Sequence, residues 1–169
     1  FESDLKRVDA EAIAFARRYE GKVADLSGPD LATAVAAYER LQETLGRLMS
    51  FGSLAFAGAM DDAKVAQFYQ TLQERVNGAS VRLLFFTLEL NRIEDTDLDA
   101  KLTAPELRHY AAWLRDLRAF RPHQLSDEME KLLHEKHVAG SAAGCRRFDE
   151  TVTDLRFPVG GKDLTIAEA

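Results

Sequence analysis

The chain has few of the features that mark secreted, membrane or nucleic-acid-binding proteins. Cys145 is the only cysteine among 169 residues, so no disulfide can form within the chain, and a reduced, cytoplasmic setting is the simplest interpretation. The longest apolar stretch, Val81–Leu90, is interrupted by Arg82 and Glu89 and falls well short of the roughly 20 residues that a membrane helix needs. The net charge is −6 with both signs interspersed, and no basic patch alternates with aromatic residues. We therefore expect no nucleic-acid partner and no membrane partner.

The chain also lacks a complete zinc-peptidase motif. Residues 134–137 read His-Glu-Lys-His, one residue short of H-E-x-x-H, in which histidines at i and i+4 bind one zinc and the glutamate is the general base. Here the histidines are three apart, and His109 and His123 are the only others in the chain. We interpret His134 and His137 as exposed or locally hydrogen-bonded, with no metal ligand predicted.

Three further patterns each lack residues or geometry that a functional site of their kind requires. Glu106-x-x-His109 is half of the ligand set of a di-iron helical bundle, and no second E-x-x-H follows. Cys145 precedes two arginines, which lower the pKa of reactive thiols, but neighbouring residues on a helix point in different directions, so we predict a buried or half-buried structural cysteine. Residues 140–144 lack the lysine of a phosphate loop. The prediction is therefore no catalytic, cofactor-binding or metal-binding residue in this chain.

What the chain does have is apolar residues at helical spacing along most of its length. This pattern predicts an all-α bundle of about six helices, several of them long. The expected helices run from residue 1 to Gly21, from Ser27 through residue 55, from residues 61–62 through 90, from residues 103–106 to a break at Arg121-Pro122, from Ser126 to Gly140, and through residues 148–155.

Four details of this bundle are also predicted. Residues 83–88 are apolar on nearly all sides, which places this part of the third helix centrally. Residues 94–101 are expected to form a polar linker. Met129, Leu132 and Leu133 share one face of the fifth helix, expected to be its buried face. Gly46, Gly52 and Gly58 each weaken the second helix by roughly 1 kcal/mol relative to alanine, and close helix packing is the expected compensation.

The pattern changes to alternation near the end of the chain. Residues 155–159 and 164–166 alternate apolar and polar side chains around Gly160-Gly161, which predicts a short β-hairpin with Pro158 on an edge strand. Because an isolated hairpin is marginal in water, it is expected to pack on the helices or on another part of the protein. We predict a helical bundle over residues 1–154 and a hairpin or connector over residues 155–169.

Several stretches, in their order, resemble the amino-terminal region of oligoendopeptidase F-type enzymes, in the thimet-oligopeptidase-like clan of zinc metallopeptidases. They are residues 19–23, residues 45–54, Leu107-x-x-Tyr110 leading into residues 117–123, and a Leu155-Arg-Phe157 segment before the glycine turn. The sharpest is Pro122-His-Gln-Leu-Ser-Asp-Glu-Met-Glu-Lys-Leu-Leu133, similar to the family's proline-histidine-x-leucine run before an E-x-x-L helix. One departure lies near Gly144-Cys145, where the family pattern has a tryptophan.

The resemblance implies a function for a longer polypeptide. The parent enzyme would be a cytoplasmic zinc metalloendopeptidase that cleaves short peptides, with its zinc ligands outside this chain. Its partners here would be the C-terminal catalytic domain of the same polypeptide and short peptide substrates. The implied role of this domain is to wall the substrate channel and restrict substrate size. The absence of an initiator methionine and the abrupt end also suggest a piece of something longer. The alternative is an independent helical protein-interaction module with no enzymatic role.

Overall fold

The computed structural model describes residues 1–166 and has the predicted all-α fold with a terminal hairpin. The α-helices are α1 (Glu2–Tyr19), α2 (Gly28–Ala57), α3 (Ala63–Arg92), α4 (Asp95–Leu102), α5 (Ala111–Ala119), α6 (Asp127–His137) and α7 (Ser141–Asp154). Short 3-10 helices η1 (Val23–Asp25), η2 (Pro105–Tyr110) and η3 (Arg121–His123) join them, and strands β1 (Phe157–Val159) and β2 (Lys162–Leu164) follow. The six predicted helices are all present, and α4 is an additional short one.

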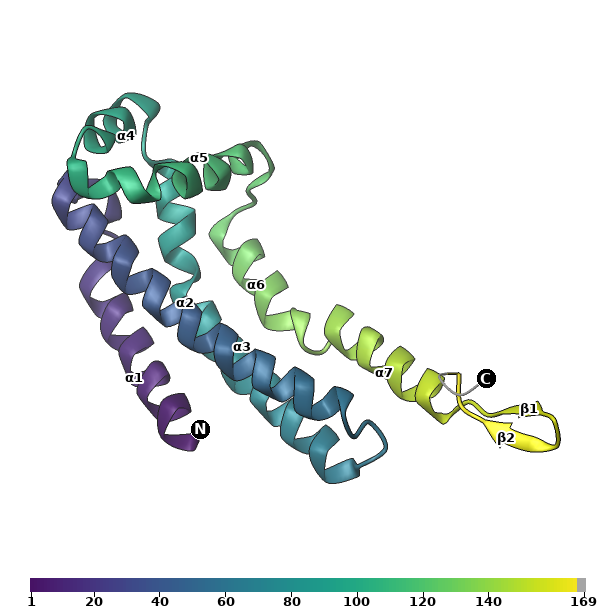
Figure 1. Ribbon diagram of the computed structural model, residues 1–169. Coiled ribbons are helices and arrows are strands. Elements are labelled where there is room, and N and C mark those ends of the chain that lie inside the picture. The colour runs from purple at the N-terminus through teal and green to yellow at the C-terminus, as the bar shows by residue number, and fades with distance from the viewer. Residues whose placement is uncertain (167–169) are drawn as a thin grey trace.

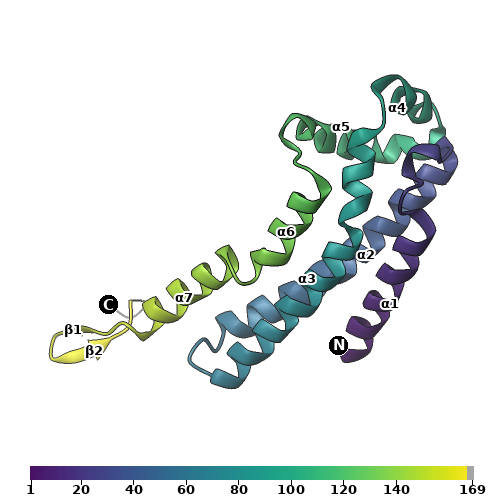
Figure 2. The same ribbon diagram turned by 180° about the vertical axis from the view of Figure 1, so that it is seen from behind.

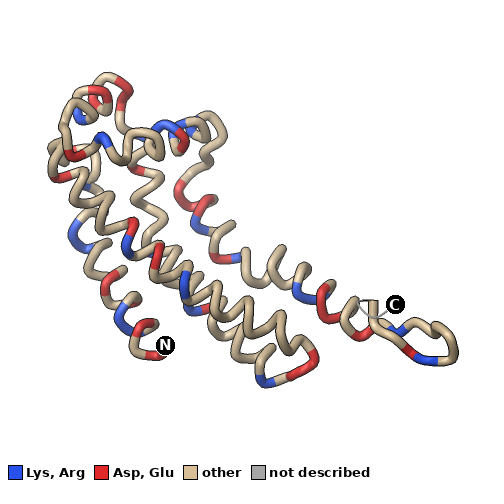
Figure 3. The backbone as a smooth tube through the Cα atoms, in the orientation of Figure 1, with Lys and Arg blue, Asp and Glu red and all other residues tan. Residues whose placement is uncertain are grey.

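The long helices α1, α2 and α3 lie side by side, and α4 and α5 lie across one end of them (Figure 1). Helices α6 and α7 then run back along the outside as an arm, with the β-hairpin at its tip (Figures 1 and 2). Acidic and basic residues are interspersed over the helices (Figure 3). Within residues 1–166, no helix is long and apolar enough to cross a membrane.

Three of the predicted helix starts lie where their capping residues predicted them, whereas the predicted start at residues 103–106 has Ala104 as its N-cap and no side-chain cap. Ser27 Oγ accepts a hydrogen bond from Asp30 N at 3.3 Å, Asp62 Oδ1 from Lys64 N at 2.7 Å, and Ser126 Oγ from Met129 N at 3.4 Å. These bonds satisfy donors that a helix N-terminus otherwise leaves free. At the end of α1, Gly21 has φ +74°, the left-handed conformation that glycine adopts at a helix C-terminus.

The core lies between α1, α2 and α3 and extends to α4, η2 and α5. Helix α1 buries one face, and Leu83 and Phe86 of α3 are completely inaccessible, which confirms that this part of α3 is central. The buried residues of α1 are Leu5, Val8, Ala12, Phe15 and Tyr19. Buried core side chains of the described residues lie between Leu5 and Leu114. The division into residues 1–154 and 155–169 stays a prediction, and residues 167–169 of the predicted connector lie outside the described residues.

The polar linker predicted over residues 94–101 is wrong, because this segment forms α4. Leu98 is buried in the core, and Asp95 and Asp97 lie in the first turn of α4, where carboxylates complement the helix dipole. Lys101 Nζ donates a hydrogen bond of 2.6 Å to the backbone oxygen of Leu26. The predicted fourth helix correspondingly begins as the 3-10 helix η2 and becomes α-helical at Ala111.

The buried face predicted for α6 is also wrong. Met129, Leu132 and Leu133 are 47%, 45% and 53% exposed, and neither α6 nor α7 has a buried residue. Helix α6 meets α3 through a charged side chain instead, because Asp127 forms an ion pair with Arg92. The apolar residues of α6 therefore stay accessible in this chain.

The predicted hairpin is confirmed, with Gly160 and Gly161 at its turn. Gly160 and Gly161 have φ values of +60° and +81°, as a two-residue type I′ turn requires. Strands β1 and β2 are antiparallel, with Phe157 opposite Leu164 and Val159 opposite Lys162. Both strands are largely exposed, so they do not pack on the helices, and their packing on another part of the protein stays a prediction.

Glu89 of α3 holds the turn that follows α1, and its removal is expected to destabilise the protein. Its two carboxylate oxygens accept hydrogen bonds from Gly21 N at 2.7 Å and Val23 N at 3.2 Å. Because bonds to a charged acceptor contribute more than neutral ones, we expect Glu89→Ala to lower the free energy of unfolding by about 2 kcal/mol. Urea denaturation measures the change.

Glu74→Ala is the matched control for this prediction. Glu74 lies on the same helix and accepts a hydrogen bond of 3.2 Å from the side chain of Gln70 on the surface. Its replacement is expected to change the unfolding free energy by no more than about 0.5 kcal/mol. Equal effects of the two substitutions would contradict the anchoring role of Glu89.

Candidate functional site

The histidine cluster that the sequence singled out is not assembled into a metal site. His134 and His137 lie exposed on α6, and His137 Nδ1 is 2.9 Å from Ser141 Oγ at the start of α7. No group of three or more histidine, cysteine, aspartate or glutamate side chains that could hold a metal exists in residues 1–166. The described residues therefore do not fit a zinc site, since zinc needs three or four protein ligands.

The other candidate residues lie apart from one another. Cys145 is exposed on α7, so the predicted buried or half-buried cysteine is wrong; the reason is that α7 buries none of its residues. Its neighbour Arg146 forms an ion pair of 3.8 Å with Glu150. His109, from the E-x-x-H pattern, lies on η2 with its ring 4.9 Å from that of Tyr110, in an edge-to-face contact.

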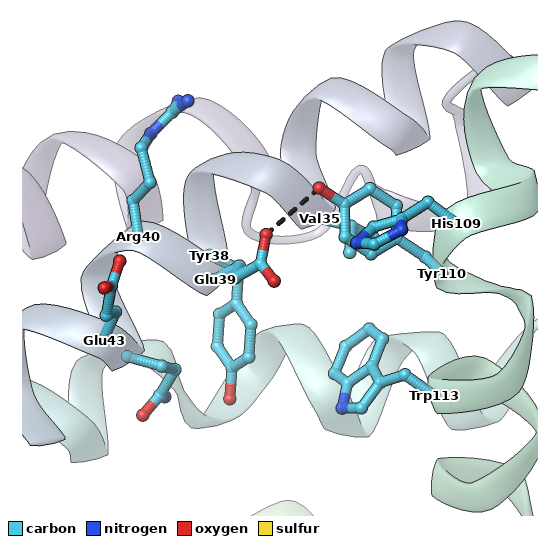
Figure 4. A pocket seen from close by; sticks show the side chains of 9 residues that line it. Val35, Tyr38, Glu39, Arg40, Glu43, His109, Tyr110 and Trp113 are labelled. Carbon is cyan, nitrogen blue, oxygen red and sulfur yellow. Dashed lines mark hydrogen bonds between the residues drawn. The ribbon is translucent and has the colours of Figure 1, made fainter.

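An open pocket of about 740 Å³ lies between α2 and the η2–α5 segment (Figure 4). Val35, Tyr38 and Glu39 line it from α2, and Tyr110 and Trp113 line it from the other side. The pocket borders the core. The centroid of the Tyr38 ring lies 5.0 Å from that of the core residue Phe86 and 6.0 Å from that of Trp113. It is thus an aromatic pocket with acidic side chains at its edge.

The two tyrosines of this pocket keep their protons to higher pH than usual. Burial raises the pKa of Tyr38, and a hydrogen bond with Gln42 partly offsets this. Burial also raises the pKa of Tyr110, and Glu39 raises it further by accepting a 3.1 Å hydrogen bond from the hydroxyl, while the charge of Arg40 acts in the opposite direction. Both phenols are therefore neutral hydrogen-bonding groups at neutral pH.

Sequence reasoning did not find this pocket. Trp113 packs against the core and also lines the opening. The sequence signal for this pocket was the spacing of Glu39 and Glu43, which are four residues apart and therefore lie on one face of α2. The sequence does not indicate that these two glutamates lie close to residues 109–113 in space.

The arm carries a second surface of interest, made of exposed apolar side chains. We call Leu125, Met129, Leu132, Leu133 and Phe148 the arm surface; their exposed fractions run from 45% to 67%. Leu155, Phe157 and Val159 continue this exposure into the hairpin. A concentration of exposed large apolar residues is typical of an interaction surface.

Comparison with known proteins assigns this helical domain to a family. Residues 89–157, from the end of α3 to the start of β1, match the family model described as Oligopeptidase F. Oligopeptidase PepF of Bacillus subtilis (strain 168) is 30% identical over 139 residues, which are 79% of this chain and 20% of that protein. No solved structure matches the chain significantly.

These matches identify the chain as an N-terminal domain of the oligopeptidase F family, which confirms the resemblance seen in the sequence. The family is one of zinc oligopeptidases, and the described part of this chain contains no metal-binding group. The match spans about 20% of the relative's length, so most of that protein lies outside it.

Proposed function

We propose that this chain is the non-catalytic N-terminal domain of a cytoplasmic zinc metallo-oligopeptidase, and that it walls the substrate channel and restricts entry to short peptides. The zinc ligands and the catalytic glutamate then belong to the C-terminal catalytic domain of the same polypeptide. The family match over residues 89–157 is the observation that carries this proposal, because it contains helices α6 and α7 of the arm.

The arm surface supports a partner within the same polypeptide. Helices α6 and α7 contribute no buried residue, yet they expose large apolar side chains such as Leu133 and Phe148. A fully exposed side chain of this kind forfeits roughly 1.5–3 kcal/mol relative to burial, and these half-exposed side chains forfeit about half of that each, so a cover is favoured. The remaining 80% or so of a relative such as PepF supplies a cover large enough for this.

Substrate restriction follows from such an arrangement. A helical domain packed beside a catalytic domain leaves a passage whose width limits what reaches the reactive centre. An extended short peptide passes, whereas a folded protein is too wide. The domain then contributes to selectivity by exclusion, without donating a catalytic group.

The isolated chain is expected to show neither peptidase activity nor stoichiometric zinc binding. Hydrolysis of a quenched-fluorescent peptide and metal analysis after dialysis against zinc are the two measurements. Robust hydrolysis that disappears in His134→Ala or His137→Ala would contradict the proposal, because it would place the zinc in this chain.

A variant of the arm surface tests the packing against the catalytic domain in the full-length polypeptide. Leu133→Glu places a charge where an apolar contact is proposed, and burying an unpaired charge costs several kcal/mol. We expect the ratio of kcat/KM for a long peptide to that for a short one to rise at least about tenfold as the channel opens.

His134→Glu is the matched control, since it places the same charge at the adjacent, exposed position of α6. It is expected to leave the ratio unchanged. In the isolated chain, Leu133→Glu should alter the unfolding free energy by no more than about 0.5 kcal/mol, since Leu133 is already 53% exposed. An unchanged ratio for Leu133→Glu would refute the channel-walling role of the arm.

The alternative function is an independent helical interaction module that uses the same arm surface on a separate protein. The gene's reading frame separates the two. An H-E-x-x-H motif several hundred residues downstream supports the peptidase, and a stop codon directly after Ala169 supports the module.

A further inference from the structure

The pocket between α2 and α5 combines an apolar interior with a carboxylate at its edge. Val35 is buried at its base, and the half-buried rings of Tyr38 and Trp113 form two walls. In Figure 4, the Glu39 carboxylate lies between the Tyr38 side and the Tyr110 side of this opening. A ligand with an apolar stem and a polar end would contact both kinds of surface.

The charged residues in the lining are Glu39, Arg40 and Glu43, and His109 lies beside Tyr110 on the opposite wall. Glu43, one turn further along α2, is paired with Arg47 at 2.5 Å. Glu39 Oε2 accepts the hydrogen bond from Tyr110, and within residues 1–166 its Oε1 makes no hydrogen bond or ion pair. Glu39 is therefore a charged acceptor that the fold holds in place through one oxygen and leaves open at the other.

Arg40 also lines the pocket, and its charge opposes that of Glu39. Figure 4 shows its side chain directed away from Trp113, with the guanidinium far from the aromatic rings. The positive charge thus lies at the outer edge, and the negative charge of Glu39 lies nearer the aromatic interior. This order favours a cation inside the pocket.

We infer that this pocket binds the basic side chain of a peptide, a guanidinium or ammonium group on an aliphatic stem. The stem packs against Tyr38, Trp113 and Val35, and the cationic end forms a charge-assisted hydrogen bond with Glu39 Oε1. The faces of Tyr38 and Trp113 add a cation–π attraction, which tryptophan supplies best. A neutral side chain of the same shape keeps the stem contact and a weaker hydrogen bond to Glu39, but it loses the opposite charge and the cation–π attraction, so the site discriminates by charge.

Trp113 makes the binding directly measurable, because it is the only tryptophan in the chain and it lines the pocket. Its fluorescence is followed while the isolated chain is titrated with blocked Ala-Arg-Ala. We expect a saturable change that weakens as salt is added, since salt screens the charge at this exposed edge. The isosteric citrulline peptide is expected to bind about tenfold more weakly or not at all.

Three variants sharpen the result. Glu39→Gln keeps the shape and removes the charge, and it is expected to weaken binding about tenfold. Arg40→Gln removes the opposing charge and is expected to strengthen binding. Glu135→Gln, on an arm helix that supplies no residue to the pocket, is the control and is expected to change nothing. Far-UV circular dichroism verifies that each variant is folded.

Several outcomes would overturn the inference. They are the absence of a saturable signal, equal affinity for the arginine and citrulline peptides, or an unchanged affinity in folded Glu39→Gln. Tighter binding of agmatine than of the peptide would overturn the assignment to a peptide side chain, because agmatine carries the same guanidinium without a peptide. The measurement uses this chain alone, so its result is independent of the proposed peptidase role.

Discussion

Replacing Phe86 by alanine is expected to lower the free energy of unfolding by about 3–5 kcal/mol. The Phe86 ring is completely inaccessible to solvent. It packs edge-to-face against Phe15 at 5.1 Å between centroids and in a tilted arrangement against Tyr38 at 5.0 Å. It therefore joins α1, α2 and α3 at one point. The alanine variant loses the burial of the ring and leaves a cavity that these three helices can only partly close. Urea denaturation gives the change from the midpoint and the slope.

Phe120→Ala is the control for the same deletion at the surface. Phe120 follows α5 and is 68% exposed, so its replacement is expected to change stability by no more than about 0.5 kcal/mol. A loss below about 1 kcal/mol for Phe86→Ala would contradict the central position of α3, because a ring at the junction of three helices cannot be removed at so small a cost.

The helix starts could be predicted from the sequence because capping is a local interaction. Ser27, Asp62 and Ser126 each bond to a backbone amide two or three residues further on, so the residues that decide the start are contiguous in sequence. The turn of the hairpin was predictable for the same reason, since Gly160 and Gly161 by themselves permit the positive φ values that the turn requires.

The exposure of the arm could not be predicted in this way. Helical periodicity shows that Met129, Leu132 and Leu133 share a face, and it carries no information on what covers that face. We predicted that this face is buried inside the bundle. In the structure the face is exposed, and Asp127 of α6 forms an ion pair with Arg92 of α3. A helix whose apolar side is exposed in one domain is consistent with a cover supplied by another.

The aromatic pocket escaped sequence reasoning because its two walls come from distant segments. Tyr38 lies on α2 and Trp113 on α5, and each has the spacing of a core residue. Both do pack on the core, as that spacing indicates. Their second role as walls of an opening depends on the position of η2 and α5 relative to α2. That position is set by α4, which contacts both α2 and η2 and which we had predicted to be a linker.

The replacement of Gly28 by alanine is expected to destabilise the protein by about 1–3 kcal/mol, because α2 and α4 touch at this residue. A Cβ atom at Gly28 would lie 2.6 Å from the Cβ of Ala104 and 2.8 Å from the backbone oxygen of Lys101. Neither neighbour is the end of a flexible side chain, so the backbones must separate. That separation also strains the hydrogen bond from Lys101 Nζ to the Leu26 oxygen, which holds the same contact. Thermal and urea denaturation measure the loss.

Gly46→Ala in the same helix is expected to act in the opposite direction. No atom lies within 4 Å of a Cβ placed at Gly46, and the residue is in the helix interior, where alanine is favoured by roughly 0.5–1 kcal/mol over glycine. The sequence predicted close helix packing at Gly46, Gly52 and Gly58. The structure shows it at Gly52, where a Cβ would meet Leu72 at 2.4 Å, and not at Gly46 or Gly58. If both Gly28→Ala and Gly46→Ala stabilised the protein, the close approach of α4 to the start of α2 would be wrong, and with it the contact that positions η2 and α5 over the aromatic pocket.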